Sequence, residues 1–164
     1  MKKKLVIILS VIYLLIVSLF FLDIYFDFEM KNELLKKSIY YGFLFISPTI
    51  LISNLFLIKK MNLKILSLIL SVLPIIIIIK IGFLKILFLS ESWKTQMILY
   101  ENSEDNSVRV EYQLKDLGAL GYRKRTVEVN YYSHYFMKVK PYNKENTKNW
   151  KRVDKYINEL ELKN

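Results

Sequence analysis

The chain divides into two stretches with different hydrophobic patterns. Three long apolar runs occupy the first ninety residues: Leu5–Leu22, Ile39–Ile58 and Ile65–Leu89. Each run approaches or exceeds the roughly 20 residues that a helix needs to cross a bilayer. The pattern therefore predicts a membrane α-helical bundle of three transmembrane helices over residues 1–90, followed by a separate polar domain over residues 91–164.

The polar stretch alternates instead with a period of two. From Val108 to Leu114, apolar residues interleave with polar ones, which is typical of a strand with one buried face. The same reasoning predicts three further strands, at Lys94–Tyr100, Thr126–Tyr131 and roughly His134–Lys140. Apolar residues then recur at helical spacing, at Trp150, Val153, Ile157 and Leu160. We expect a small α+β domain of about four antiparallel strands with one C-terminal helix laid across a sheet face.

Charge adds an orientation to this plan. The formal net charge is +10; residues 1–90 contribute 11 Lys/Arg against 4 Asp/Glu, or +7, and residues 91–164 contribute 14 against 11, or +3. Lysines cluster at Lys2–Lys4 and in the short loop at 59–64, and such basic segments stay on the cytoplasmic side. We therefore expect a retained signal-anchor helix and a multi-pass protein of the bacterial cell (inner) membrane. Its N-terminus is predicted to be cytoplasmic, its polar domain periplasmic, and its partner the lipid bilayer rather than nucleic acid.

Ionisable residues near the ends of the apolar runs have two interpretations. Asp23, Lys80 and Lys85 would lie at similar depth if the runs cross a bilayer. They could extend to the outer membrane edge and pair there, Asp23 with Lys80 or Lys85, or Lys80 could be a functional charge within the bundle.

A second group of candidate residues lies in the polar domain. Exposed tyrosines suit a protein interface, and adjacent cations suit a carboxylate or phosphate group. The predicted partner-binding residues are Tyr122, Arg123, Lys124, Arg125, Tyr131 and Tyr135. Strand alternation puts Arg123 and Arg125 on the same face as Val127 and Val129, so the arginines must lie beyond the edge of the core or a bulge must intervene. The adjacent loop at 118–121 is either an anion cradle or a plain turn.

Cysteine is absent and His134 is the one histidine. This excludes disulfides, a lipid-modified cysteine anchor and zinc sites built from cysteine and histidine. Neither a G-x-S-x-G nor an H-E-x-x-H motif occurs, so we predict no catalytic residues, metal or cofactor.

These observations predict a non-enzymatic integral membrane protein whose outer domain binds another membrane or envelope protein or an anionic envelope component. A homo-oligomer is compatible with this prediction. Two alternatives stay open: an immunity-type protein that neutralises a membrane-acting toxin, and a small transporter or channel subunit that uses Lys80.

Overall fold

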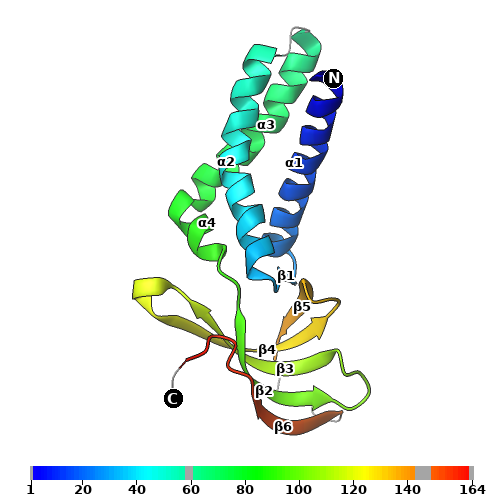
Figure 1. Cartoon of the computed structure of the whole chain (residues 1–164), viewed down its shortest axis with the longest axis vertical. Coiled ribbons are helices and arrows are strands. Elements are labelled where there is room, and N and C mark those ends of the chain that lie inside the picture. Colours follow the sequence, from blue (N-terminus) through cyan, green and yellow to red (C-terminus); the bar gives the residue numbers. More distant parts are fainter. Residues whose placement is uncertain (1, 58–60, 143–148, 163–164) are drawn as a thin grey trace. The chain divides into compact units, whose positions relative to one another are not determined.

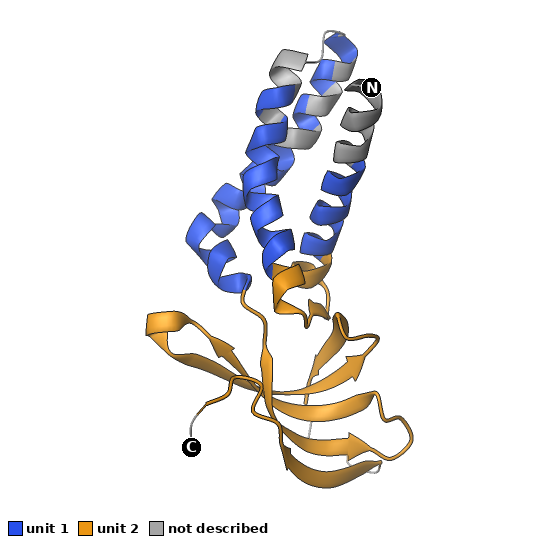
Figure 2. Ribbon diagram, viewed as in Figure 1, with its two compact units in different colours: residues 1–21, 37–90 blue, residues 22–36, 91–164 orange. Residues whose placement is uncertain are grey.

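The computed structural model describes residues 2–57, 61–142 and 149–162. The chain forms two compact units, one of residues 1–21 and 37–90 and the other of residues 22–36 and 91–164 (Figure 2). The second unit thus includes a segment, residues 22–36, that lies between the first two apolar runs in the sequence.

The first unit is helical. Its helices are α1 (Lys2–Tyr25), α2 (Glu33–Leu57), α3 (Met61–Ile81) and α4 (Phe83–Leu89) (Figure 1). Aromatic packing joins α1 to α2, because the Phe20 ring stacks on Phe43 at 3.8 Å and meets Tyr40 edge-on at 5.0 Å. Gly82 separates α3 from α4 with φ of 92°, a conformation that side-chain-bearing residues rarely adopt.

The prediction of three transmembrane helices is wrong. Within the described residues, no single helix is both long enough and apolar enough to cross a membrane. Only Val72–Ile81 and Phe83–Leu89 reach the required length and composition, and only when taken together across a bend of 83°. The sequence pattern missed this break because the apolar run continues on both sides of Gly82.

The multi-pass membrane localisation was inferred from those three spans and is wrong with them, as are the signal-anchor helix and the inside-to-outside orientation. Lys59 and Lys60, from the basic loop used to orient the chain, lie outside the described residues.

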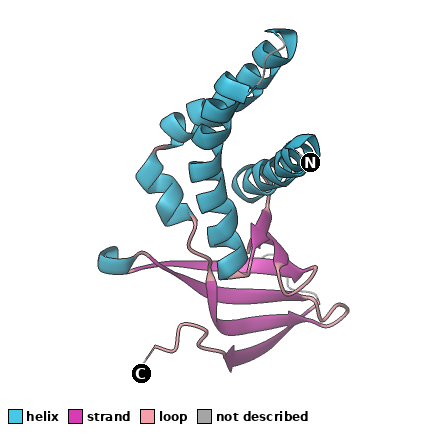
Figure 3. Ribbon diagram, turned by 45° about the horizontal axis from the view of Figure 1, so that its top comes forward, coloured by secondary structure: helices cyan, strands magenta, loops and turns pink. Residues whose placement is uncertain are grey.

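The second unit contains one antiparallel six-stranded sheet with the order β1-β5-β4-β3-β2-β6 (Figure 3). The strands are β1 (Phe28–Met30), β2 (Lys94–Asn102), β3 (Val108–Asp116), β4 (Tyr122–Tyr131), β5 (Phe136–Pro141) and β6 (Trp150–Tyr156). The four-strand prediction is therefore wrong in number, because β1 and β6 extend the central β2–β5 meander at its two edges.

The predicted C-terminal helix is wrong as well. Residues Trp150–Tyr156 form β6, which pairs with β2 along Met97–Asn102. A helix of about eleven residues is marginal alone, since nucleation costs more than so few hydrogen bonds return. When residues 150–156 pair with the edge of β2, their backbone N–H and C=O groups gain hydrogen bonds without the cost of nucleating a helix.

The central strand β3 is buried on both faces. Val110 and Leu114 are buried on one face, whereas Glu111, Gln113 and Lys115 are buried on the other. The register pairs Glu111 with Val127 and Arg109 with Val129, so the polar residues adjoin a small apolar cluster of Val127, Val129, Met137 and Val139. This polar face holds the candidate site.

Candidate binding pocket

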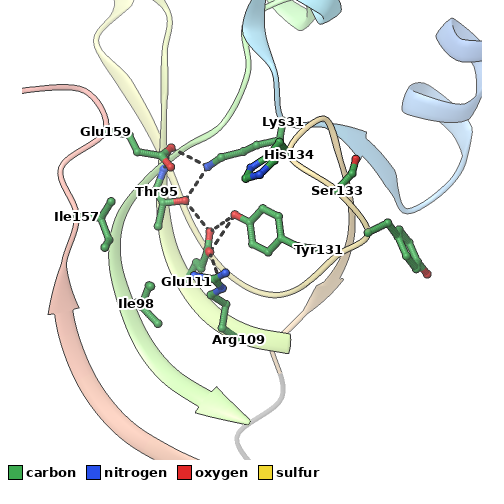
Figure 4. Close-up of a pocket in the computed structure, with 11 residues that line it drawn as sticks. Lys31, Thr95, Ile98, Arg109, Glu111, Tyr131, Ser133, His134, Ile157 and Glu159 are labelled. Atoms are coloured by element: carbon green, nitrogen blue, oxygen red, sulfur yellow. Dashed lines mark hydrogen bonds and ion pairs between the residues drawn. The ribbon is translucent and has the colours of Figure 1, made fainter. Parts of the chain in front are cut away.

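An open pocket of about 540 Å³ lies on the polar face of the sheet unit (Figure 4). Its walls combine four charged side chains with isoleucines and tyrosines. The lining residues are Lys31, Thr95, Ile98, Arg109, Glu111, Tyr131, Tyr132, Ser133, His134, Ile157 and Glu159. They come from the segment before α2, from β2, β3 and β4, from the β4–β5 turn and from the residues after β6.

Glu111 is the most buried charge of the pocket, with 1% of its surface exposed. Its carboxylate accepts hydrogen bonds from Thr95 Oγ1 at 2.7 Å, Gln113 Nε2 at 2.7 Å and the Tyr131 hydroxyl at 3.0 Å. Burial, together with the neighbouring Glu111 carboxylate, raises the pKa of Tyr131, so its hydroxyl stays protonated and donates. Hydrogen bonds from neutral groups of the protein therefore replace water around the Glu111 carboxylate, which is not an exposed base.

Arg109 is the cation that retains an unused donor. Its Nε lies 3.7 Å from Glu111 Oε1, which is too long for a hydrogen bond, and its guanidinium carbon lies 4.8 Å from the Tyr131 ring centre. Nε is buried and has no hydrogen-bond acceptor among the described residues. The side chain as a whole is 31% exposed, and it is part of the pocket lining. Because a guanidinium carries five donors, this arginine can still bind an acceptor.

Lys31 and Glu159 form an ion pair at another part of the pocket wall. Lys31 Nζ lies 2.6 Å from Glu159 Oε2 and donates to Thr95 Oγ1 at 2.7 Å. The backbone N–H of Thr95 donates to the same Glu159 oxygen at 2.7 Å. Figure 4 shows the resulting row of contacts from Glu159 through Lys31 and Thr95 to Glu111 and Arg109.

Gln113 connects this pocket to a second polar cluster. Its Oε1 accepts from Arg125 Nε at 2.9 Å, and Arg125 binds both carboxylate oxygens of Glu29 at 2.7 Å. The Arg125 guanidinium also lies 4.1 Å from the Trp93 ring centre. Burial alone would raise the pKa of Glu29, but the hydrogen bonds and charge of Arg125 outweigh it and hold that pKa below its ordinary value.

The residues predicted for partner binding are spread over three places. Tyr122, Arg123 and Lys124 are exposed on the part of the β3–β4 hairpin next to its turn, and Tyr135 is exposed in the β4–β5 turn. Tyr131 is half-buried in the pocket. Arg123 and Arg125 face Lys115 and Gln113 across a regular ladder, so no bulge intervenes between them. Their prediction as a partner site stays a prediction.

The turn at Gly118–Leu120 is a short 3₁₀ segment whose backbone donors are used locally. The N–H of Leu117 donates to Gly121 O at 2.9 Å, that of Gly121 to Gly118 O at 3.0 Å, and that of Gly118 to the Asp116 carboxylate at 2.7 Å. These bonds occupy the N–H groups of Leu117, Gly118 and Gly121.

Of the three ionisable residues near the ends of the apolar runs, Asp23 belongs to the sheet unit. Its carboxylate lies 3.0 Å from Lys36 Nζ and accepts from the Met30 N–H at 2.8 Å. Lys80 and Lys85 are exposed side chains of α3 and α4.

Sequence reasoning missed the principal residues of the pocket. Glu111 and Thr95 sit in predicted strands, where alternation assigned the polar positions of 108–114 to solvent; Glu159 sits in the segment predicted as helix. Lys31 precedes the domain predicted at 91–164 and carried no signal of its own.

Within the part of the chain that the structure describes, no three His, Cys, Asp or Glu side chains gather as metal ligands. Comparison with protein-family models, with characterised proteins and with solved structures gives no match.

Proposed function

We propose that the sheet unit is a binding module that takes a small carboxylate-bearing ligand, or the corresponding group of a partner protein, into this pocket. The observation that carries the proposal is Arg109, a cation that lines the pocket with 31% of its side chain exposed and its guanidinium carbon 4.8 Å from the Tyr131 ring centre. Guanidinium and carboxylate match in a two-pronged, charge-assisted arrangement. Arg109 therefore brings to the pocket wall the same group that binds a carboxylate at Arg125 elsewhere in the unit.

The rest of the pocket suits an amphipathic ligand. Ile98, Ile157 and the tyrosines supply apolar wall beside the charges. A volume of about 540 Å³ falls within the range of roughly 300–1,000 Å³ that small-molecule sites occupy. A ligand with one carboxylate and one apolar group would use both kinds of surface.

Binding accounts for the pocket better than catalysis does. Glu111 accepts from three neutral donors, and Lys31 is held by Glu159 and Thr95. General acid–base or nucleophilic work needs a group aimed at the substrate and activated by a neighbour. The immunity-type alternative stays a prediction. None of the pocket contacts described above bears on it.

Nuclear magnetic resonance titration tests this proposal with N-acetyl-phenylalanine and its uncharged amide as probes. The acid should bind about tenfold more tightly than the amide, since a charge-assisted hydrogen bond contributes about 1.5–3 kcal/mol. Arg109→Gln should remove that preference. The matched control is Arg123→Gln, which changes an exposed arginine of the same sheet and should leave the preference intact. Equal binding of acid and amide to the unchanged protein would refute the proposal.

A further inference from the structure

We infer that Lys31 and the backbone N–H of Thr95 form a second carboxylate-binding subsite, which the chain itself fills with Glu159. The inference concerns the pocket of the proposed function and rests on it for the nature of the ligand. It adds that Glu159 is an internal competitor: a ligand with a second carboxylate gains this subsite by replacing the Glu159 side chain.

The subsite is built from parts far apart in the sequence. The Lys31 ammonium and the Thr95 N–H approach one oxygen of Glu159 at 2.6 and 2.7 Å, and the Lys31 side chain is only 14% exposed. An ammonium and a strand N–H directed at one point are a recognition arrangement for any carboxylate, since neither donor depends on the rest of the glutamate. Thr95 Oγ1 fixes Lys31 in place and is itself fixed by Glu111.

The segment that delivers Glu159 follows β6 and is attached to β2. The N–H groups of Ile157 and Asn158 donate to Gln96 O at 2.9 and 3.2 Å, and that of Glu159 donates to Thr95 O at 3.0 Å. Glu161 has φ of 54°, in the left-handed region that costs most residues with side chains of the order of 1 kcal/mol or more, whereas asparagine tolerates the same φ at Asn158. The left-handed backbone at Glu161 and the place of this segment after the last strand make it easier to displace than a strand in mid-sheet.

Charge gives the displacement a direction. With Glu159 in place, Lys31 and Arg109 balance Glu111 and Glu159, so the charged lining sums to zero. Without the Glu159 carboxylate the sum is +1. The pocket therefore attracts an anionic ligand more strongly once Glu159 has left it, and a tethered carboxylate competes at an effective concentration near the millimolar range.

Chemical rescue tests the inference, with acetate as the probe. Glu159→Ala should lower the melting temperature, and acetate should restore it with a saturable dependence at constant ionic strength set with sodium chloride. The unchanged protein should show a weaker dependence, because its Lys31 subsite is full and acetate can use Arg109 alone. Glu161→Ala is the matched control, since Glu161 is an exposed glutamate of the same segment and does not line the pocket. Glu159→Ser gives a second variant with a small side chain.

Adding Lys31→Met to Glu159→Ala should reduce the acetate effect to the level of the unchanged protein. If acetate stabilises Glu159→Ala no more than chloride or no more than it stabilises Glu161→Ala, the subsite does not exist. That result leaves the Arg109-dependent preference for N-acetyl-phenylalanine to be measured independently. Loss of that preference alone would overturn the proposed function and leave the Lys31 subsite standing.

Discussion

Lys115 is a buried ammonium whose neighbours determine how strongly it opposes folding. The residue is 5% exposed on the polar face of β3. Burial, and then the positive charge of Lys36, lower its pKa from 10.5 to about 8, against the opposing attraction of Glu29, Asp23 and Glu91. Holding this charge at neutral pH costs stability that a neutral side chain of similar length would not.

The pH dependence follows from that shift. Between pH 8 and 10.5 the unfolded chain keeps the Lys115 proton that the folded protein has lost, so the free energy of unfolding rises with pH. We expect a gain of about 1–2 kcal/mol from pH 7.5 to 9.5, by urea unfolding. Lys115→Met should flatten this rise and stabilise the protein at pH 7.5. Lys124→Met, at an exposed lysine of β4, should preserve the rise; a rise retained by Lys115→Met would contradict the assignment.

Arg125 illustrates why residue type alone assigns roles poorly. Alternation places it correctly on the face of Val127, at the edge of the apolar cluster. Its partner Glu29 lies ninety-six residues earlier in the chain. Glu29 belongs to β1, a strand of only three residues, which is too short to be recognised from alternation. An arginine whose acceptor is so distant in sequence is indistinguishable from an exposed one, so sequence reasoning treated it as partner surface.

At the scale of elements, the β3–β4 hairpin depends on glycine at one end of its turn. Gly121 has φ of 78° and ψ of −148°, a region nearly restricted to glycine, and a Cβ atom added there would meet nothing within 4 Å. Gly121→Ala should therefore destabilise by about 1–3 kcal/mol through backbone strain alone. Leu120→Ala, at a side chain that is 73% exposed, should change stability by less than about 0.5 kcal/mol in the same urea measurement. Equal effects of the two changes would show that the turn is not strained.

The same scale shows what period-two patterning can and cannot predict. The four strands expected from alternation overlap β2–β5, although β4 begins four residues earlier than expected, because local spacing and turn residues between them are sufficient to mark a meander. β6 was missed since Trp150, Val153 and Ile157 fit helical spacing equally well, and the deciding factor is the open edge of β2 about fifty residues earlier. The pocket was missed for a related reason: the polar positions of β3 are buried by partners that only tertiary structure supplies.

For the whole molecule, the division into two units does not follow the order of the sequence. Residues 22–36 interrupt the helical unit in sequence and belong to the sheet unit, where they supply β1, Glu29 and Lys31 (Figure 2). The sequence pattern changes from long apolar runs to alternation near residue 91. A domain boundary drawn there separates residues 91–164 from β1, Glu29 and Lys31, although all of them belong to one unit. Composition shows where the hydrophobic pattern changes along the chain. The sheet unit is instead defined by contacts between residues 22–36 and residues 91–164.

The sheet unit should therefore depend on residues 22–36 for both stability and binding. A fragment of residues 91–164 retains Arg125 without Glu29 and Glu159 without Lys31, and it leaves the edge of β5 uncovered. Leaving a largely buried ion without its partner costs about 3–5 kcal/mol, which is a large share of the stability of a domain of this size.

We expect this fragment to unfold at lower urea concentration, with reduced cooperativity, than the sheet unit of the full chain. A synthetic peptide of residues 22–36 should restore part of the difference, whereas the same peptide with Glu29→Gln and Lys31→Gln should not. A fragment as stable as the full-chain unit would show instead that the contacts of residues 22–36 add nothing to the sheet.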